Sequence, residues 1–315
     1  MGRRRKKGRP VNGWIVLDKD YDVGSTEAVG KVKWLFQAQK AGHAGTLDPL
    51  ATGILPIALG EATKTAAHVT DARKTYRFTA KWGETTSTDD AEGEVIKRSD
   101  ARPTSDAIND VLARFTGEID QVPPQFSAVM VNGERAYDIA REGETVALPS
   151  RKISVYSLSL LDTPDADTAI FEAETGKGAY VRAIVRDMAV ALGTCGHVTA
   201  LRRTAVGPFR EENAITIAEL EAYEGPEARE DALAPIHEAL LHMPQAPIGG
   251  PEADKLRRGQ PAILSPAVAR GVRAGESGFL SAVLAVENNA PVAICALDGL
   301  KLKPSRVFNL DTGNL

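Results

Sequence analysis

The stretch Gly42-His43-Ala44-Gly45-Thr46-Leu47-Asp48-Pro49-Leu50-Ala51-Thr52-Gly53 places one carboxylate in a turn that is punctuated by glycines and bounded by apolar residues. Glycine permits positive φ angles and the close approach of a ligand, and Pro49 keeps Asp48 out of helical geometry. The segment therefore predicts a rigid, exposed loop, and such loops often carry function. A second interpretation stays open at this point, because Asp-Pro dipeptides also serve simply to stabilise turns.

Short periodic segments surround this loop. Apolar or alternating patterns predict strands at 14–17, 54–59, 75–82, 126–131, 152–161 and 169–175, with the last two paired across a turn at 162–167. Helical spacing predicts a helix capped by Ser25, a second over 104–115, and a third from near Tyr180 to Gly193 whose outward face carries Arg182, Arg186 and Asp187. Strands and helices interleave without a strict repeat, so we expect an α+β fold with a mixed, mainly antiparallel sheet and flanking helices.

A segment rich in proline and glycine, 243–251, reads as a linker. We therefore expect a main domain over 11–245 and a small β-rich domain over 246–315. The second is too short to form a large core without docking against the first.

Charge is segregated along the chain. Its net charge is −4, yet the first nine residues hold six basic groups and no acid, which leaves −10 for the remainder. A basic arm over 1–10 suits a polyanion such as RNA, and it is equally consistent with a disordered, solubilising tail. No stretch approaches the ~20 apolar residues that span a bilayer, so we expect no membrane association and a cytoplasmic protein.

Common cofactor and metal motifs are absent. The sequence has no GxxxxGK[ST], no HExxH and no GxGxxG that opens a helix, and its five histidines lack convincing ligand spacing. Its two cysteines, Cys195 and Cys295, form no CxxC and are expected to be packing residues. We expect neither a metal nor a cofactor.

Two groups of aromatic and cationic residues suggest RNA chemistry. Tyr76 lies in Lys74-Thr75-Tyr76-Arg77-Phe78, where rings alternate with basic residues as they do where a base stacks beside its phosphates. The same pattern suits an ordinary tyrosine of a strand. Arg182, two residues after Tyr180, is either a solvated helix residue or a guanidinium that orients a carboxylate, and spacing does not choose between them.

Several blocks taken together resemble the bacterial TruB-type tRNA pseudouridine synthases, and the match spans most of the chain. The blocks are Asn12-Gly13 with the strand that follows, Ala41-Gly42-His43 through Gly53, Gly60-Glu61-Ala62-Thr63-Lys64, Lys74-Thr75-Tyr76-Arg77, Lys177-Gly178-Ala179-Tyr180-Val181-Arg182 and Leu201-Arg202-Arg203-Thr204. A single short block could be coincidence, but several in family order are highly specific.

The resemblance implies a pseudouridine synthase core with a C-terminal domain similar to the PUA type. It implies that Asp48 is the nucleophile, that Tyr76 stacks on the target base and takes part in proton transfer, and that Arg182 pairs with Asp48. It further implies substrate-binding roles, with His43 displacing the target base, Tyr180 lining the pocket, Leu201 packing in it, and Lys64 and Lys19 binding substrate. Family members commonly read Asp-Lys-Pro after the first strand, whereas this chain has Asp18-Lys19-Asp20, which predicts a less rigid and more acidic turn.

The implied reaction isomerises uridine 55 in the T-loop of tRNA, without a cofactor and with tRNA as the partner of a monomeric enzyme. Two alternatives remain: an RNA-binding or tRNA-folding module with little catalysis, and a pseudouridine synthase that acts on ribosomal RNA.

Overall fold

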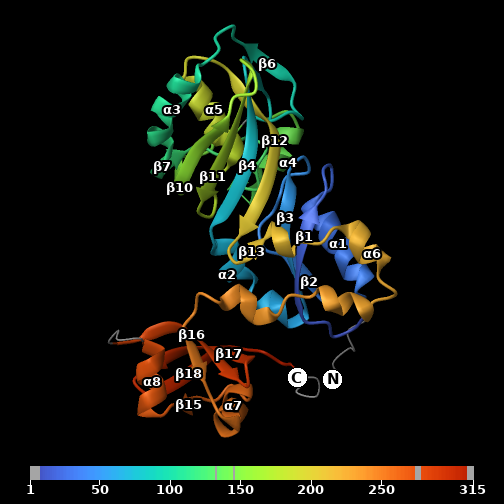
Figure 1. Cartoon of the computed structure of the whole chain (residues 1–315), viewed down its shortest axis with the longest axis vertical. Coiled ribbons are helices and arrows are strands. Elements are labelled where there is room, and N and C mark those ends of the chain that lie inside the picture. The colour runs from blue at the N-terminus through green and yellow to red at the C-terminus, as the bar shows by residue number, and fades with distance from the viewer. Residues whose placement is uncertain (1–7, 132, 145, 274–277, 311–315) are drawn as a thin grey trace.

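The computed structural model describes residues 8–131, 133–144, 146–273 and 278–310, and most of the basic arm lies outside these ranges. A nine-stranded sheet forms the larger part of the protein (Figure 1). Its main path follows the order β1-β3-β12-β4-β11-β10-β7, with β2 paired to β3 and β13 paired to β12. The strands are β1 (Gly13–Lys19), β2 (Ala41–His43), β3 (Thr52–Leu59), β4 (Lys74–Trp82), β7 (Gly117–Gln121), β10 (Arg151–Asp162), β11 (Thr168–Thr175), β12 (Gly196–Val206) and β13 (Phe209–Arg210).

All pairings in this sheet are antiparallel except that of β3 with β12. β10 and β11 pair across the expected turn. The predicted α+β fold with a mixed, mainly antiparallel sheet is therefore confirmed.

Helices and 3₁₀ turns alternate along the sequence with the strands of this sheet. They are α1 (Ser25–Leu35), α2 (Ala66–Asp71), α3 (Ser105–Leu112), α4 (Ala136–Arg141), α5 (Val181–Ala191) and α6 (Ile217–Ala222), with 3₁₀ turns η1 (Gly60–Lys64), η2 (Ala113–Phe115), η3 (Glu211–Asn213), η4 (Ala228–Ala232) and η5 (Ile236–Leu240). The Thr104 hydroxyl caps α3 by accepting from the amide of Ala107, and Thr216 with Glu219 forms a capping box on α6. Val181, Ile184, Val185 and Met188 of α5 enter the main core as their spacing predicts.

Two local predictions were wrong. Ser25 is the first residue of α1 rather than its cap, because its hydroxyl instead bonds Leu47. The stretch 126–131 is mostly turn, since Ser127 donates back to the carbonyl of Gln125, and only β8 (Met130–Val131) pairs there, with β9 (Glu134–Arg135). The hairpin of β5 (Glu84–Thr86) and β6 (Val95–Arg98) completes this part of the chain.

A second, five-stranded sheet lies beyond the α2 end of the large one (Figure 1). It has the order β14-β16-β17-β18-β15 and carries α7 (Gly250–Arg257) and α8 (Pro266–Arg273). The strands are β14 (Gln245–Pro247), β15 (Ala262–Ile263), β16 (Leu280–Glu287), β17 (Ala290–Asp298) and β18 (Lys301–Val307). The expected linker is thus part of this unit, because prolines are tolerated in the edge strand β14 and at the first turn of α7.

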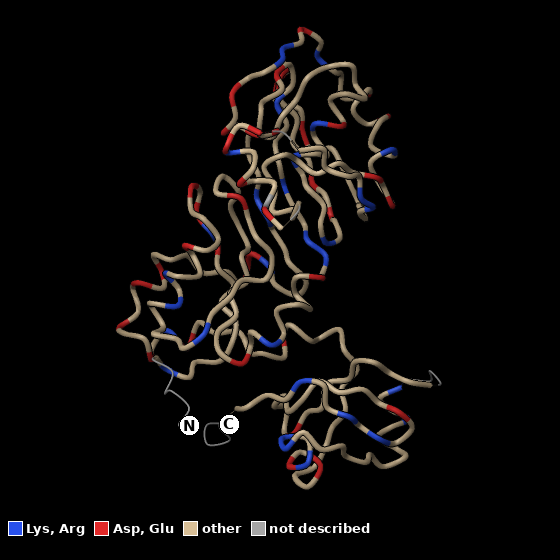
Figure 2. Tube along the Cα trace, turned by 180° about the vertical axis from the view of Figure 1, so that it is seen from behind, with Lys and Arg blue, Asp and Glu red and all other residues tan. Residues whose placement is uncertain are grey.

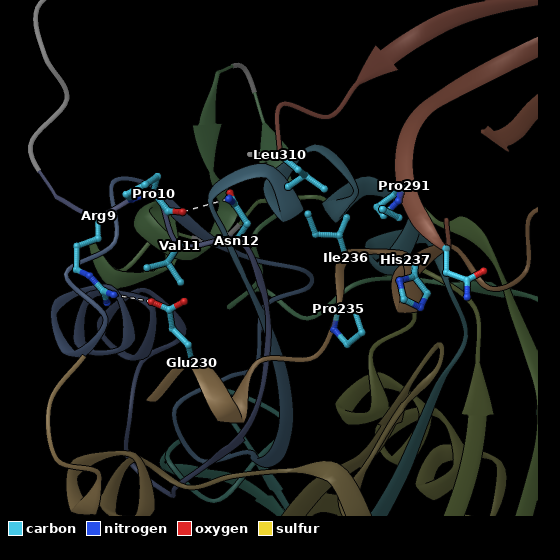
Figure 3. A pocket seen from close by; sticks show the side chains of 12 residues that line it. Arg9, Pro10, Val11, Asn12, Glu230, Pro235, Ile236, His237, Pro291 and Leu310 are labelled. Atoms are coloured by element: carbon cyan, nitrogen blue, oxygen red, sulfur yellow. Dashed lines mark hydrogen bonds and ion pairs between the residues drawn. The ribbon is translucent and has the colours of Figure 1, made fainter. Parts of the chain in front are cut away.

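One hydrophobic cluster joins the two sheets. Trp14 of β1 and Leu240 of η5 share it with Leu284, Ile294 and Phe308 from the C-terminal unit. Beside this contact lies a cavity of about 500 Å³ between the segment 9–12, η5 and the start of β17 (Figure 3). Arg9 closes one side of it by an ion pair of 2.6 Å to Glu230.

Acidic and basic residues are interspersed over both units (Figure 2). Among the described residues no helix is both long enough and apolar enough to cross a membrane. In the same ranges no cluster of His, Cys, Asp and Glu side chains is arranged to hold a metal ion.

Candidate active site

The Asp48 loop joins β2 to β3 and is fixed on both sides of the aspartate. Gly45 and Gly53 have φ angles of 94° and 93°, which favour glycine. The Ser25 hydroxyl donates to the Leu47 carbonyl at 2.8 Å and accepts from the Leu47 amide at 2.9 Å. The loop is therefore held from α1, and the Asp48 side chain remains about one-third exposed at 36%.

Lys19 holds the residue that follows Asp48. Its ammonium donates to the carbonyls of Asp20, Val23 and Pro49 at 2.8, 2.7 and 3.0 Å, and the side chain is buried. The Asp22 amide also donates to Pro49, at 2.9 Å. Burial lowers the pKa of Lys19 to about 8. The acidic turn at Asp18-Lys19-Asp20 is thus tied to the Asp48 loop through backbone carbonyls.

Arg182 joins two carboxylates. Its Nη2 lies 2.8 Å from Asp48 Oδ2 and its Nη1 lies 3.2 Å from Asp90 Oδ2. The same two nitrogens donate to the carbonyls of Phe126 and Thr88 at 2.9 and 3.0 Å. The predicted pairing of Arg182 with Asp48 is present, but the prediction that Arg182 faces outward is wrong. The segments around Thr88 and Phe126 cover that face of α5, so the guanidinium is buried.

Asp90 is a site residue that the sequence analysis missed. Its carboxylate is buried, accepts from the Glu92 amide at 3.0 Å and faces Arg182. The neighbouring Asp89 pairs with Arg186 at 3.0 Å, and burial raises the pKa of Asp89. The signal available in the sequence was the adjacent acid pair itself, whose partners on α5 lie more than ninety residues away.

A small cavity of about 70 Å³ opens beside this ion pair. Four of the predicted site residues line it: Asp48, Tyr76, Arg182 and Leu201. Tyr76 comes from β4 and Leu201 from β12, which are adjacent antiparallel strands. Segments far apart in the sequence thus place an aromatic ring, an apolar side chain and a paired carboxylate around one space.

The other four predicted residues lie outside the lining of this cavity. His43 ends β2; its Nδ1 is buried without a hydrogen-bond partner in the described structure, and burial together with Arg203 lowers its pKa. The Tyr180 backbone exchanges two hydrogen bonds with the Gln121 amide, and its ring centroid lies 5.0 Å from the Arg151 guanidinium. Lys64 donates to the Val307 carbonyl at 2.8 Å, and Lys19 has the internal bonds described above.

An aspartate held by a guanidinium beside a tyrosine thus lies on this mixed sheet, and family models of the pseudouridylate synthases match the chain. The model of the TruB family pseudouridylate synthase N-terminal domain matches residues 33–181, and that of the tRNA pseudouridylate synthase B C-terminal domain matches 182–241. The chain belongs to the TruB family.

Relatives cover nearly the whole chain. It is 50% identical over 307 residues to tRNA pseudouridine synthase B of Caulobacter vibrioides, covering 98% of this chain and 99% of that one. It is 54% identical over 268 residues to the protein of that name from Agrobacterium fabrum, covering 83% and 85%. Among solved structures it is similar to the crystal structure of a Cbf5-Nop10-Gar1 complex, with a TM-score of 0.71 and 26% identity over 94% of this chain and 85% of that one.

Proposed function

We propose that this enzyme isomerises uridine 55 in the T-loop of tRNA to pseudouridine. The observation that carries the proposal is the 2.8 Å ion pair between Arg182 and Asp48 in a cavity that Tyr76 also lines. The printed name of the relatives, tRNA pseudouridine synthase B, supports tRNA as the substrate.

The reaction breaks the N-glycosidic bond, rotates the uracil and rejoins it to ribose through C5, so the hydrogen on C5 is released and no redox equivalent is consumed. Asp48 must be ionised to act as the nucleophile, and the ion pair with Arg182 holds its carboxylate in one orientation. Asp90 pairs with the other terminal nitrogen of the Arg182 guanidinium, Nη1.

The target uridine must leave its stack before it reaches Asp48, which costs a few kcal/mol. Tyr76 would stack on the displaced base and take part in proton transfer, while Leu201 would pack against the base. His43 would enter the space that the base leaves, and Tyr180 would border the pocket. The internal hydrogen bonds of Lys19 and Lys64 favour supporting roles for both residues over direct contact with RNA.

We further propose a catalytic domain over 11–245, a PUA-like domain over 246–315 and an RNA-binding arm over 1–10, in a monomeric, cytoplasmic enzyme. The five-stranded sheet of the C-terminal unit, which begins at Gln245, supports this division.

The test is a tritium-release assay with RNA that carries tritium at C5 of uridine, run side by side on tRNA and ribosomal RNA. We expect release from tRNA alone, limited to one equivalent per molecule, and none when uridine 55 is replaced by cytidine. Release from ribosomal RNA alone would favour the second substrate class, and tRNA binding without any release would favour a binding module.

A further inference from the structure

Arg203 is a buried cation next to the candidate active site for which the reaction described above has no use. It lies on β12 two residues after Leu201, so both side chains are on the same face of the strand. It is paired in register with Tyr76 on β4 and with Gly53 on β3. Arg203 therefore stands between the strand that carries Tyr76 and the strand that follows the Asp48 loop.

Its guanidinium binds the backbone of the catalytic loop. Nη2 donates to the Gly45 carbonyl at 3.0 Å, Nη1 donates to the Thr46 carbonyl at 3.2 Å, and Nε donates to the Ile54 carbonyl at 2.7 Å. Gly45 and Thr46 lie midway between His43 and Asp48 in the sequence. One side chain thus holds both ends of the loop, from a strand position that is paired in register with Tyr76.

Arg203 has no carboxylate within ion-pair distance among the described residues, although only 1% of it is exposed. Burial of a charge without an ionic partner is costly, and a neutral residue of similar size would fill the space at less cost. The chain retains a guanidinium where packing alone does not require one.

We infer that Arg203 is a positioning residue for the isomerisation, which fixes the loop from His43 to Asp48 relative to the Tyr76 side chain. A planar fork with five donors can hold these three carbonyls together, whereas the ammonium of a lysine cannot reach all of them. The geometry of nucleophile and stacking ring would then depend on one side chain that never touches the substrate. This inference rests on the proposed function.

The test compares Arg203→Lys with Arg202→Lys in the complete protein. Arg202 is the neighbouring residue, points to the other face of β12 and pairs with Asp18 and Glu211 on the surface. Single-turnover rate constants are measured with tRNA and saturating enzyme, and tRNA affinity is measured separately by filter binding. We expect Arg203→Lys to lower the rate constant at least 30-fold with an affinity within threefold of the wild type, and Arg202→Lys to leave the rate constant within threefold.

A purely structural role would reduce the fraction of protein that binds tRNA, but not the rate constant of the molecules that are bound and saturated. The readout therefore remains valid if part of the Arg203→Lys protein fails to fold. A rate constant for Arg203→Lys within threefold of the wild type would overturn the inference, whereas an inactive wild type would instead overturn the proposed function.

Discussion

At the scale of residues, the site is built from one guanidinium shared by two carboxylates of different exposure. Asp48 is partly open to solvent and Asp90 is buried, with Arg182 between them. Of the two carboxylates, only that of Asp48 is accessible from outside the protein. The buried carboxylate limits the orientations that Arg182 can adopt, so it acts on Asp48 through the arginine.

Replacement of Asp48 by Asn tests the nucleophile. We expect Asp48→Asn to abolish tritium release from tRNA and to keep tRNA affinity within about threefold, because the amide preserves shape but cannot attack. The control is Asp71→Asn, a surface change next to Lys177 that lies outside the cavity. Turnover of Asp48→Asn near the wild-type rate would contradict the assignment.

Asp90→Asn tests the buried partner. Removal of this charge leaves Arg182 free to turn away from Asp48, and small misplacements of catalytic groups can cost ~100-fold in rate. We expect the single-turnover rate constant to fall by about 10- to 100-fold without loss of tRNA affinity. Glu172→Gln, which removes an exposed partner of Arg77, is the matched control. Equal rates for the two variants would show that Asp90 is dispensable.

The sequence predicted Asp48, Tyr76 and Arg182 through their motifs but could not predict how they are covered. Helical spacing defined the apolar stripe of α5 and left Arg182 on the opposite face, which is normally solvated. The carbonyls of Thr88 and Phe126 that bury it come from irregular segments without periodicity. Contacts of that kind depend on the tertiary fold, which is also why Asp90 and Arg203 were not identified.

At the scale of elements, periodicity located five long strands and three helices of the large unit, namely β1, β3, β4, β10, β11, α1, α3 and α5. It did not locate the central strand β12, and it failed where side chains compete for the backbone. The bounds of β4, β10 and β11 agree with expectation within one residue. The wrong predictions at Ser25 and at 126–131 share a cause. Polar groups there make specific hydrogen bonds, and the pattern of apolar and polar residues does not predict such bonds.

The turn after β1 should respond to pH through Lys19. Because burial lowers its pKa to about 8, the folded protein releases this proton near pH 8, whereas the unfolded chain retains it until near pH 10.5. Between these values the unfolded state binds more protons, so the free energy of unfolding should rise with pH, by up to about 1.4 kcal/mol per pH unit for this group.

Burial also lowers the pKa of Lys74 to about 8. This residue should therefore add to the rise in the free energy of unfolding with pH. Urea unfolding midpoints between pH 8 and 10 measure the effect. We expect Lys19→Met to show a shallower rise than the wild type, and Lys97→Met, a change on the exposed strand β6, to keep the wild-type slope. Parallel curves for wild type and Lys19→Met would refute this prediction.

At the scale of the whole molecule, the C-terminal sheet is attached to the large one by a shared apolar cluster and by polar contacts from η1. Lys64 donates to the Val307 carbonyl, and the Asn309 amide donates to Glu61 at 2.7 Å. Lys64 is bound at this junction and does not line the small cavity. Its motif is nevertheless one that the resemblance associates with substrate.

Lys64→Met should loosen this attachment without altering chemistry. We expect faster amide hydrogen exchange at Val307 and Phe308, by about 10-fold or more because a charged hydrogen bond contributes roughly 1.5–3 kcal/mol, and an unchanged single-turnover rate constant. Lys303→Met is the control, since that amine pairs with Asp298 within the same sheet. A large fall in the rate constant with unchanged exchange would instead favour a direct contact of Lys64 with RNA.

The place of β12 between β3 and β4 has a consequence for biosynthesis. Strands β3 and β4 leave the ribosome early and can pair with β1 and β11 on one side, but the edges that face β12 stay unpaired until residues 196–206 have been made. Closing so long an intervening chain is entropically slow, and until then both strands have open edges that can pair with other chains. The nascent protein should therefore depend on chaperone protection during this interval, and its catalytic pocket forms only after most of the chain has been translated.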